Sequence, residues 1–225
     1  MAQLKIKSQL PFLEKGGYLD DCGPSSAAAA VAYASQYSLD PSAADGIAAA
    51  ARVGRLDVNG RPDGVSLAFL VKVVKALGGK AKWAADWSEV VAAAQKGAAI
   101  LINAQSPKAY PASALKVNAF AAKRAKIGRD YGHCIVAAYD QSLGWQLADP
   151  TQTGKGKEAQ AALLTKEQVR AIAASKGDAP HKRVLIITAP QKKALPVFSS
   201  STEEQKTPEP SLRQKVIGFI RRRNV

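Results

Sequence analysis

The hydrophobic positions of this chain change their spacing part-way along, from a helical period to a strand-like one. In the first half, apolar side chains recur every three or four residues, as on one face of a helix. "NGRPDG" interrupts this half as a turn, and Gly78-Gly79 and Gly97 follow predicted helix ends. The pattern predicts four helices, over residues 22–37, 42–52, 65–77 and from Asp86 or Ser88 to Gln95.

The second half of the chain has the pattern of strands. "AAILINA" is typical of a buried strand, and "HCIVAAYD" followed by "GWQLADP" predicts a hairpin that turns around residues 141–144. We further expect short strands at residues 4–10 and 80–83, a helix that begins after Thr165, and a last strand in "HKRVLIITAP". Residues 105–130 have no clear period. Helices followed by an antiparallel sheet predict an α+β fold.

The character of the chain changes after Pro190. "SSSTEEQKTPEP" is rich in serine, proline and charge, which predicts a flexible linker over residues 191–210. Residues 211–225 then predict a short basic amphipathic helix, with an apolar stripe of Leu212, Val216, Phe219 and Ile220 beside three arginines. We expect this helix to dock on its own domain, residues 1–190, or on a partner protein. Anchoring to a membrane or nucleic acid is the alternative.

Composition narrows the functional classes. The 225 residues carry a net charge of +14, of which +5 lies beyond Pro190. The basic charge is therefore spread over the whole protein and favours binding to anionic surfaces, but it does not indicate which kind of surface. Two cysteines cannot form a disulfide framework, and the two histidines lie too far apart for a zinc motif. "TGKGK" lacks the spacing of a phosphate loop, so we expect no metal and no cofactor. We also expect no transmembrane segment and no signal peptide.

Cys22 stands in an unusual context for a core cysteine. It follows two aspartates, Asp20 and Asp21, and precedes a Gly-Pro turn at the predicted start of a helix. Backbone N–H groups and the helix dipole favour an anion at such a position, and cysteine pKa values fall there. The two aspartates oppose this effect, because nearby negative charge raises the pKa of a thiol.

A histidine and an aspartate complete a candidate catalytic set. His133 begins the first strand of the predicted hairpin, and Asp149 ends the second, sixteen residues later. The hairpin brings both to its open end, where the carboxylate can orient the imidazole. Asp140 is the rival orienter, but it lies at the turn end. Cys134 alternates with His133 along the strand and is therefore expected to be a core thiol on the opposite face.

"DCGPSSAAAAV", "GHCIVAAYD" and "WQLADP", in this order, resemble papain-like cysteine peptidases. The resemblance is strongest to the bacteriocin-processing peptidases that cut double-glycine leaders, and it covers about residues 4–190. It implies a papain-like fold, with the nucleophile at the start of a helix that packs on an antiparallel sheet.

The resemblance also implies the role of each site residue. Cys22 would be the nucleophile, His133 the general base and acid, and Asp149 the orienter. The family's oxyanion glutamine often lies six residues before the nucleophile, where this chain has Gly16. Some relatives use a longer spacing, so Gln9, thirteen residues upstream, is the candidate here.

The sequence therefore predicts a cysteine peptidase or amidase that hydrolyses a peptide bond. Its basic charge and missing export signal suggest a phage lysin or virion-associated hydrolase that acts on cell-wall peptidoglycan from the host cytoplasm or the virion. The alternative is a weak or inactive papain-like module with a structural role, for example in a phage tail tip. Specific nucleic-acid binding has only charge in its favour.

Overall fold

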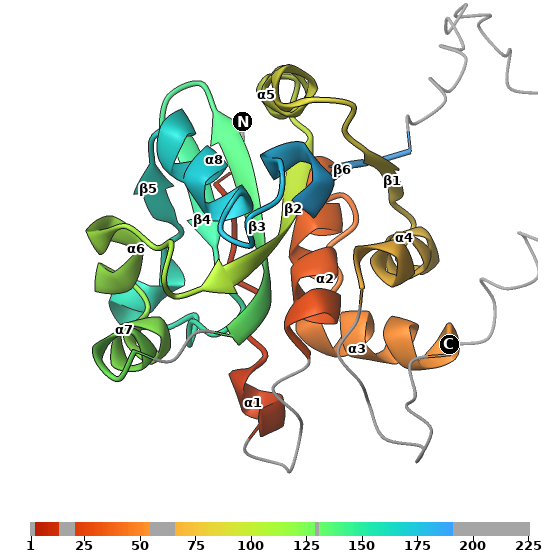
Figure 1. The fold of residues 1–225 in the computed structure, drawn as a ribbon. Coiled ribbons are helices and arrows are strands. Elements are labelled where there is room, and N and C mark those ends of the chain that lie inside the picture. Colours follow the sequence, from red (N-terminus) through yellow and green to blue (C-terminus); the bar gives the residue numbers. More distant parts are fainter. Residues whose placement is uncertain (1–2, 14–20, 55–65, 129–130, 191–225) are drawn as a thin grey trace, which may run out of the picture. The chain divides into compact units, whose positions relative to one another are not determined.

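A computed structural model describes residues 3–13, 21–54, 66–128 and 131–190 (Figure 1). The chain separates into two units, Met1–Gln191 and Lys192–Val225, and every element described below belongs to the first. The predicted linker and terminal helix, the "NGRPDG" turn, Gly16 and Asp20 lie outside the described residues.

From Cys22 on, the predicted elements occur in the predicted order, among further ones that were not predicted. The helices are α1 Leu10–Leu13, α2 Cys22–Ala34, α3 Ala43–Arg52, α4 Leu67–Ala76, α5 Trp87–Gln95, α6 Ala112–Lys116, α7 Ala119–Lys126 and α8 Lys166–Ala173. The strands are β1 Lys80–Trp83, β2 Ala99–Ser106, β3 Tyr131–Asp140, β4 Gly144–Ala148, β5 Ala162–Leu164 and β6 Val184–Thr188. Short 3₁₀ turns cover Gly156–Ala159 and Pro180–Arg183.

One six-stranded sheet organises the domain, in the order β1-β6-β2-β3-β4-β5. Each of its neighbouring pairs is antiparallel. The predicted hairpin of β3 and β4 is present, with Asp140 opposite Gly144 at its turn. The predicted α+β class is therefore confirmed.

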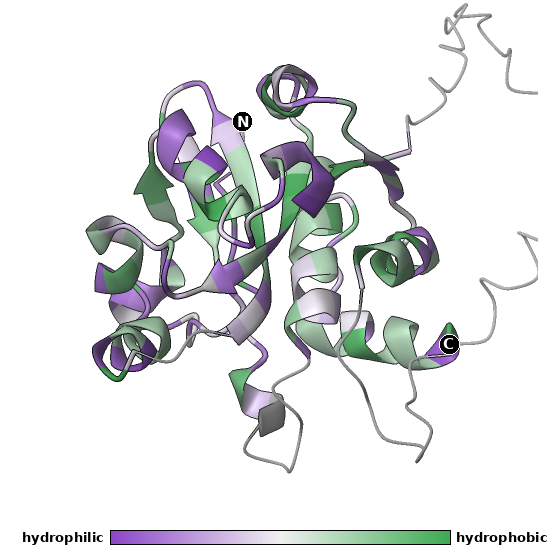
Figure 2. Cartoon of the chain, viewed as in Figure 1, coloured by the Kyte–Doolittle hydropathy of each residue, from purple (hydrophilic) through white to green (hydrophobic). Residues whose placement is uncertain are grey.

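Helices cover both faces of the sheet, as alternating strand residues require. Leu101, Cys134 and Val136 point to the face that α2 and α4 cover. Ile102 and Ile135 point to the other face, among side chains of α5 and α8. Hydrophobic colours dominate the first part of β2 in Figure 2, and hydrophilic colours mark its arrowhead. The polar end of the central strand is the end that carries the site described below.

The start of the chain differs from the prediction. Residues 4–10 do not form a strand; Lys5 makes an isolated bridge to Gln160, and α1 begins at Leu10. Side chains accept from two backbone amides of this segment in place of a strand partner. The Leu4 amide donates to Gln146 Oε1 at 3.1 Å, and the Lys5 amide donates to the Tyr37 hydroxyl at 2.9 Å.

Three other elements, α6, α7 and β5, had no clear sequence signal. The unassigned stretch 105–130 contains α6 and α7, and α7 is capped by Asn118, whose side chain accepts from the Ala121 amide. The three-residue strand β5 follows the hairpin at the edge of the sheet. Helix α2 is three residues shorter than predicted, because Gln36 and Tyr37 adopt left-handed backbone angles after it.

Candidate active site

Cys22 is the first residue of α2, and its thiol is half-buried. The N-cap residue Asp21 makes no side-chain cap, so the amides of the first turn are not taken up by a capping carboxylate. Helix α3 packs closely on this turn: a Cβ placed on Gly46 would lie 2.3 Å from the Pro24 carbonyl oxygen. The start of α2 is therefore positioned by a close backbone contact that only glycine permits.

The hairpin brings His133 and Asp149 together at its open end. His133 Nε2 lies 2.8 Å from Asp149 Oδ1, and the two residues are only 2% exposed. Asp140, the rival orienter, accepts instead from the amide and hydroxyl of Ser142 and closes the turn at the opposite end. The carboxylate that can orient the imidazole is thus Asp149.

Three further groups hold the Asp149 carboxylate. The Tyr110 hydroxyl donates to Oδ2 at 2.6 Å. The Thr151 amide and hydroxyl donate to Oδ1 at 2.8 and 2.7 Å. These bonds and the charge of His133 outweigh burial and lower the pKa of Asp149. Sequence reasoning missed both partners. The D-P-T turn was a usable signal for Thr151, whereas nothing local indicated Tyr110.

The second ring nitrogen of His133, Nδ1, is not used by Asp149. Nε2 is bound to Asp149, and Nδ1 is buried with no conventional partner among the described residues. Burial disfavours charge on His133, but the Asp149 carboxylate and then the Cys22 sulfur overcome it and raise the pKa of His133 to about 10. The ring is thus suited to be an imidazolium beside a thiolate.

Cys134 is the unexpected neighbour of this pair. It is buried, as predicted, and lies on the opposite face from Ile135, but that face is the one covered by α2. One turn beyond Cys22, the Ser26 hydroxyl donates to the Cys134 carbonyl at 2.9 Å and ties α2 to β3. A hydrogen bond from the Cys134 thiol, together with His133, outweighs burial and holds the pKa of Cys22 well below its usual value. The pKa of Cys134 is raised by the same bond, so Cys134 keeps its proton.

Gln9 lies near Asp149. Its backbone amide donates at 2.8 Å to the carbonyl of Pro150, the residue after Asp149. The Gln9 side chain is fully buried, and neither its Nε2 nor its Oε1 has a hydrogen-bond partner among the described residues. Leaving an amide buried and unpaired costs about 1–3 kcal/mol, so such a group calls for an explanation.

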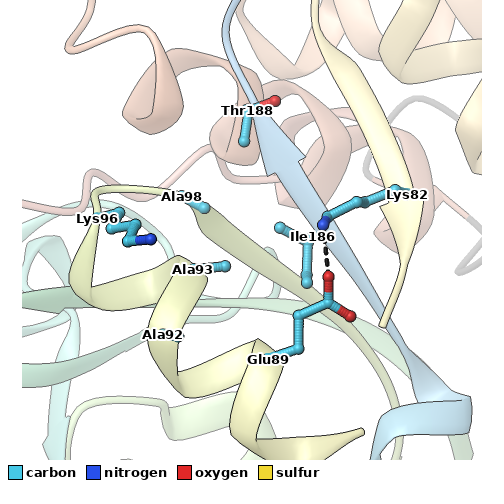
Figure 3. A pocket seen from close by; sticks show the side chains of 8 residues that line it. All are labelled: Lys82, Glu89, Ala92, Ala93, Lys96, Ala98, Ile186 and Thr188. Carbon is cyan, nitrogen blue, oxygen red and sulfur yellow. Dashed lines mark hydrogen bonds and ion pairs between the residues drawn. The ribbon is translucent and has the colours of Figure 1, made fainter. Parts of the chain in front are cut away.

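A separate pocket lies elsewhere in the domain. It has a volume of about 300 Å³ and is lined by α5 and by β1 and β6, with Lys82 and Glu89 paired across it (Figure 3). Cys22, His133 and Asp149 do not line it.

Within the described ranges, no cluster of histidine, cysteine and carboxylate side chains could hold a metal ion. In the same part of the chain, no helix has the length and apolar character needed to cross a membrane.

Comparison with known proteins gives a limited result. No protein-family model matches the chain, and no curated protein matches it. Among solved structures, the chain is similar to a Bacillus anthracis protein whose crystal structure was provisionally named a C39-like peptidase. The TM-score is 0.49 at 13% identity, over 83% of this chain and 95% of that one. We therefore infer the function of this chain from its own geometry.

Proposed function

We propose that this protein is a cysteine peptidase or amidase with Cys22 as nucleophile, His133 as general acid and base, and Asp149 as orienter. The Cys22 thiolate would attack the carbonyl carbon of a peptide bond. The His133 imidazolium would give its proton to the leaving amine, and the acyl-enzyme would then be hydrolysed by a water that the neutral imidazole deprotonates. Asp149 would hold the ring with Nδ1 toward the sulfur throughout.

The observation that carries this proposal is the joining of three separate elements at one point. The start of α2, the start of β3 and the end of β4 contribute a partly buried cysteine, an imidazole that lowers the pKa of its thiol and a carboxylate 2.8 Å from that imidazole. The pKa of the thiol is lowered and that of the imidazole is raised, which is the pairing that thiol catalysis needs. Structural cysteines have no need of such a partner.

Gln9 is our proposal for the oxyanion donor, with the Cys22 amide as the second donor. Its support is the buried side-chain amide that has no partner among the described residues and the backbone bond to Pro150. A substrate carbonyl would supply the missing acceptor when its oxygen becomes negatively charged.

The substrate we propose is a peptide, with peptidoglycan stem peptides or cross-links as the candidate physiological target. Its support is the net charge of +14, which would concentrate the protein at an acidic wall polymer. On this proposal the protein is a phage lysin or virion-associated hydrolase. The competing proposal is a structural papain-like module, which the unusual spacing between Gln9 and Cys22 favours.

Labelling with iodoacetamide at neutral pH, followed by peptide mapping, tests the proposal. Cys22 should react faster than Cys134, because Cys22 is only partly buried and the pKa of its thiol is lowered, whereas Cys134 is 3% exposed and the pKa of its thiol is raised. The His133→Ala variant should slow the reaction of Cys22. Equal rates, or preferential labelling of Cys134, would remove Cys22 as the nucleophile. Release of soluble peptides from purified peptidoglycan then distinguishes a wall hydrolase from a structural module.

A further inference from the structure

The amine of Lys176 lies at the same end of the sheet as the candidate active site. Lys176 Nζ donates to Asn103 Oδ1 at 2.7 Å, and Asn103 is directly opposite Cys134 in the β2–β3 register. A Cβ placed on Gly132 would lie 3.0 Å from the same Nζ atom. The ammonium group therefore lies over the backbone immediately before His133, in space that the absence of a side chain at Gly132 leaves open.

The segment that carries Lys176 is held in place by the sheet. The Ser175 hydroxyl accepts from the Gln105 amide of β2 at 2.7 Å and donates to the Ile172 carbonyl of α8 at 2.6 Å. Gly177 follows with a left-handed φ of +81°, which redirects the chain directly after Lys176, in the turn that follows α8. The backbone on both sides of Lys176 is thus fixed. The direction of the Lys176 side chain follows from this backbone and from its hydrogen bond to Asn103.

Among the described residues no ion pair joins Lys176 to a carboxylate, although the charges of Cys22 and Asp178 act on its amine. Its hydrogen-bond partner, Asn103, is neutral, and the nearby carboxylate of Asp178 is engaged by the guanidinium of Arg183. Lys176 is partly buried, and this burial lowers the pKa of its amine. A partly desolvated cation beside the reacting groups is well placed to receive an anion from outside the protein.

We propose that Lys176 is a specificity-determining residue that binds a carboxylate of the substrate close to the bond to be cleaved. The inference rests on the proposed function, because it takes Cys22 as the reacting group. The chemical class of substrate is then an acidic peptide, in which a side-chain or terminal carboxylate lies within reach of Nζ while the scissile carbonyl lies at Cys22. Asn103 acts as a positioning residue that holds the ammonium over Gly132.

Alkylation by two small reagents tests this without a known substrate. Iodoacetate and iodoacetamide both transfer a two-carbon group to the Cys22 thiolate and release iodide, but only iodoacetate carries a carboxylate. The rate ratio of iodoacetate to iodoacetamide at Cys22 should fall about three- to tenfold in Lys176→Met, because one nearby positive charge is lost. Lys176→Arg, which keeps the charge, should retain most of the ratio. Lys96→Met, in the pocket of Figure 3, is the matched control and should leave the ratio unchanged.

The outcomes separate this inference from the proposed function. An unchanged ratio in Lys176→Met, with Cys22 still reacting rapidly, would overturn the carboxylate site and leave the nucleophile intact. An equal fall of both rates would also overturn it, since Lys176 would then only stabilise the thiolate. A Cys22 that reacts with neither reagent in the wild-type protein would overturn both. Melting temperatures of all variants establish that each one is folded.

Discussion

Cys22 packs against the core cluster that contains Cys134, although the two residues are 112 positions apart, and each thiol shifts the pKa of the other. The contact exists because α2 packs on the face of β3 to which Cys134 points, and the bond from Ser26 to the Cys134 carbonyl fixes that packing. His133 and Cys134, successive residues of β3, both lower the pKa of the Cys22 thiol.

Removal of the second thiol should make Cys22 less acidic. Cys134→Ala deletes the hydrogen bond that contributes most to the lowered pKa of Cys22, so the pH midpoint of Cys22 alkylation should move upward. Cys134→Ser retains a donor of similar size and should move it less. The pH dependence of iodoacetamide labelling gives the midpoint. An identical midpoint in Cys134→Ala and wild type would show that His133 alone sets the acidity.

Substitutions in the candidate site should rank in a definite order. Cys22→Ala and His133→Ala should each lower peptide hydrolysis by about 10³-fold or more, because nucleophile and base act as a unit. Asp149→Asn should leave a measurable remnant, since the neutral amide still occupies the position 2.8 Å from His133 Nε2. Asp140→Asn is the matched control and should stay within about twofold of wild type. Greater damage from Asp140→Asn than from Asp149→Asn would reverse the assignment of the orienter.

The buried pair of His133 and Asp149 should make stability depend on pH in both directions. The pKa of His133 in the folded state is about 10, above the unfolded value of about 6.5, so its contribution is complete below that lower pH and is lost as pH rises toward 10. The pKa of Asp149 is lowered on folding, so its contribution is present above about pH 4 and is lost as pH falls through the folded value.

Urea unfolding at pH 6, 8 and 10 measures this effect in wild type and in His133→Gln. The difference in unfolding free energy between the two proteins should be largest at pH 6 and should shrink steadily toward pH 10. A difference that stays constant over this range would show that the imidazole carries no charge in the folded protein.

Gly46 should be intolerant of even one added methyl group. In Gly46→Ala the new Cβ would meet the Pro24 carbonyl, so α3 or the first turn of α2 must move, at a cost of about 1–3 kcal/mol in unfolding free energy. Because Pro24 lies two residues after Cys22, the alkylation rate of Cys22 should change as well. Ala48→Ser, at an exposed position of the same helix, should change the stability by no more than about 0.5 kcal/mol.

Truncation after Pro190 should leave a folded domain with its chemistry intact. The last strand, β6, ends at Thr188 and is already paired with β1 and β2. We therefore expect residues 1–190 to melt close to the full chain and to label at Cys22 equally fast, while binding to a partner or to an anionic surface weakens. A large fall in melting temperature would show that the apolar stripe of residues 211–225 belongs to the core of this domain.

The sequence by itself determined those features that depend on short-range spacing. Periodicity located α2 to α5, and the hairpin pattern placed His133 and Asp149 at one end, because antiparallel register follows from strand length and turn. The same reasoning was wrong for residues 4–10, where side chains of distant elements take the backbone bonds. Local patterns cannot reveal such competitors, since they are separated from the segment along the chain.

Only the tertiary structure decided which groups surround the site. Alternation along β3 established that Cys134 and His133 point to opposite faces, but the packing of α2 decided that one of those faces contains Cys22. Lys176 and Tyr110 reach the site from a helix end and a loop that have no motif of their own. Their positions follow from side-chain packing and from bonds between distant segments. A one-dimensional pattern does not encode these contacts, because they form only when the sheet and its helices come together.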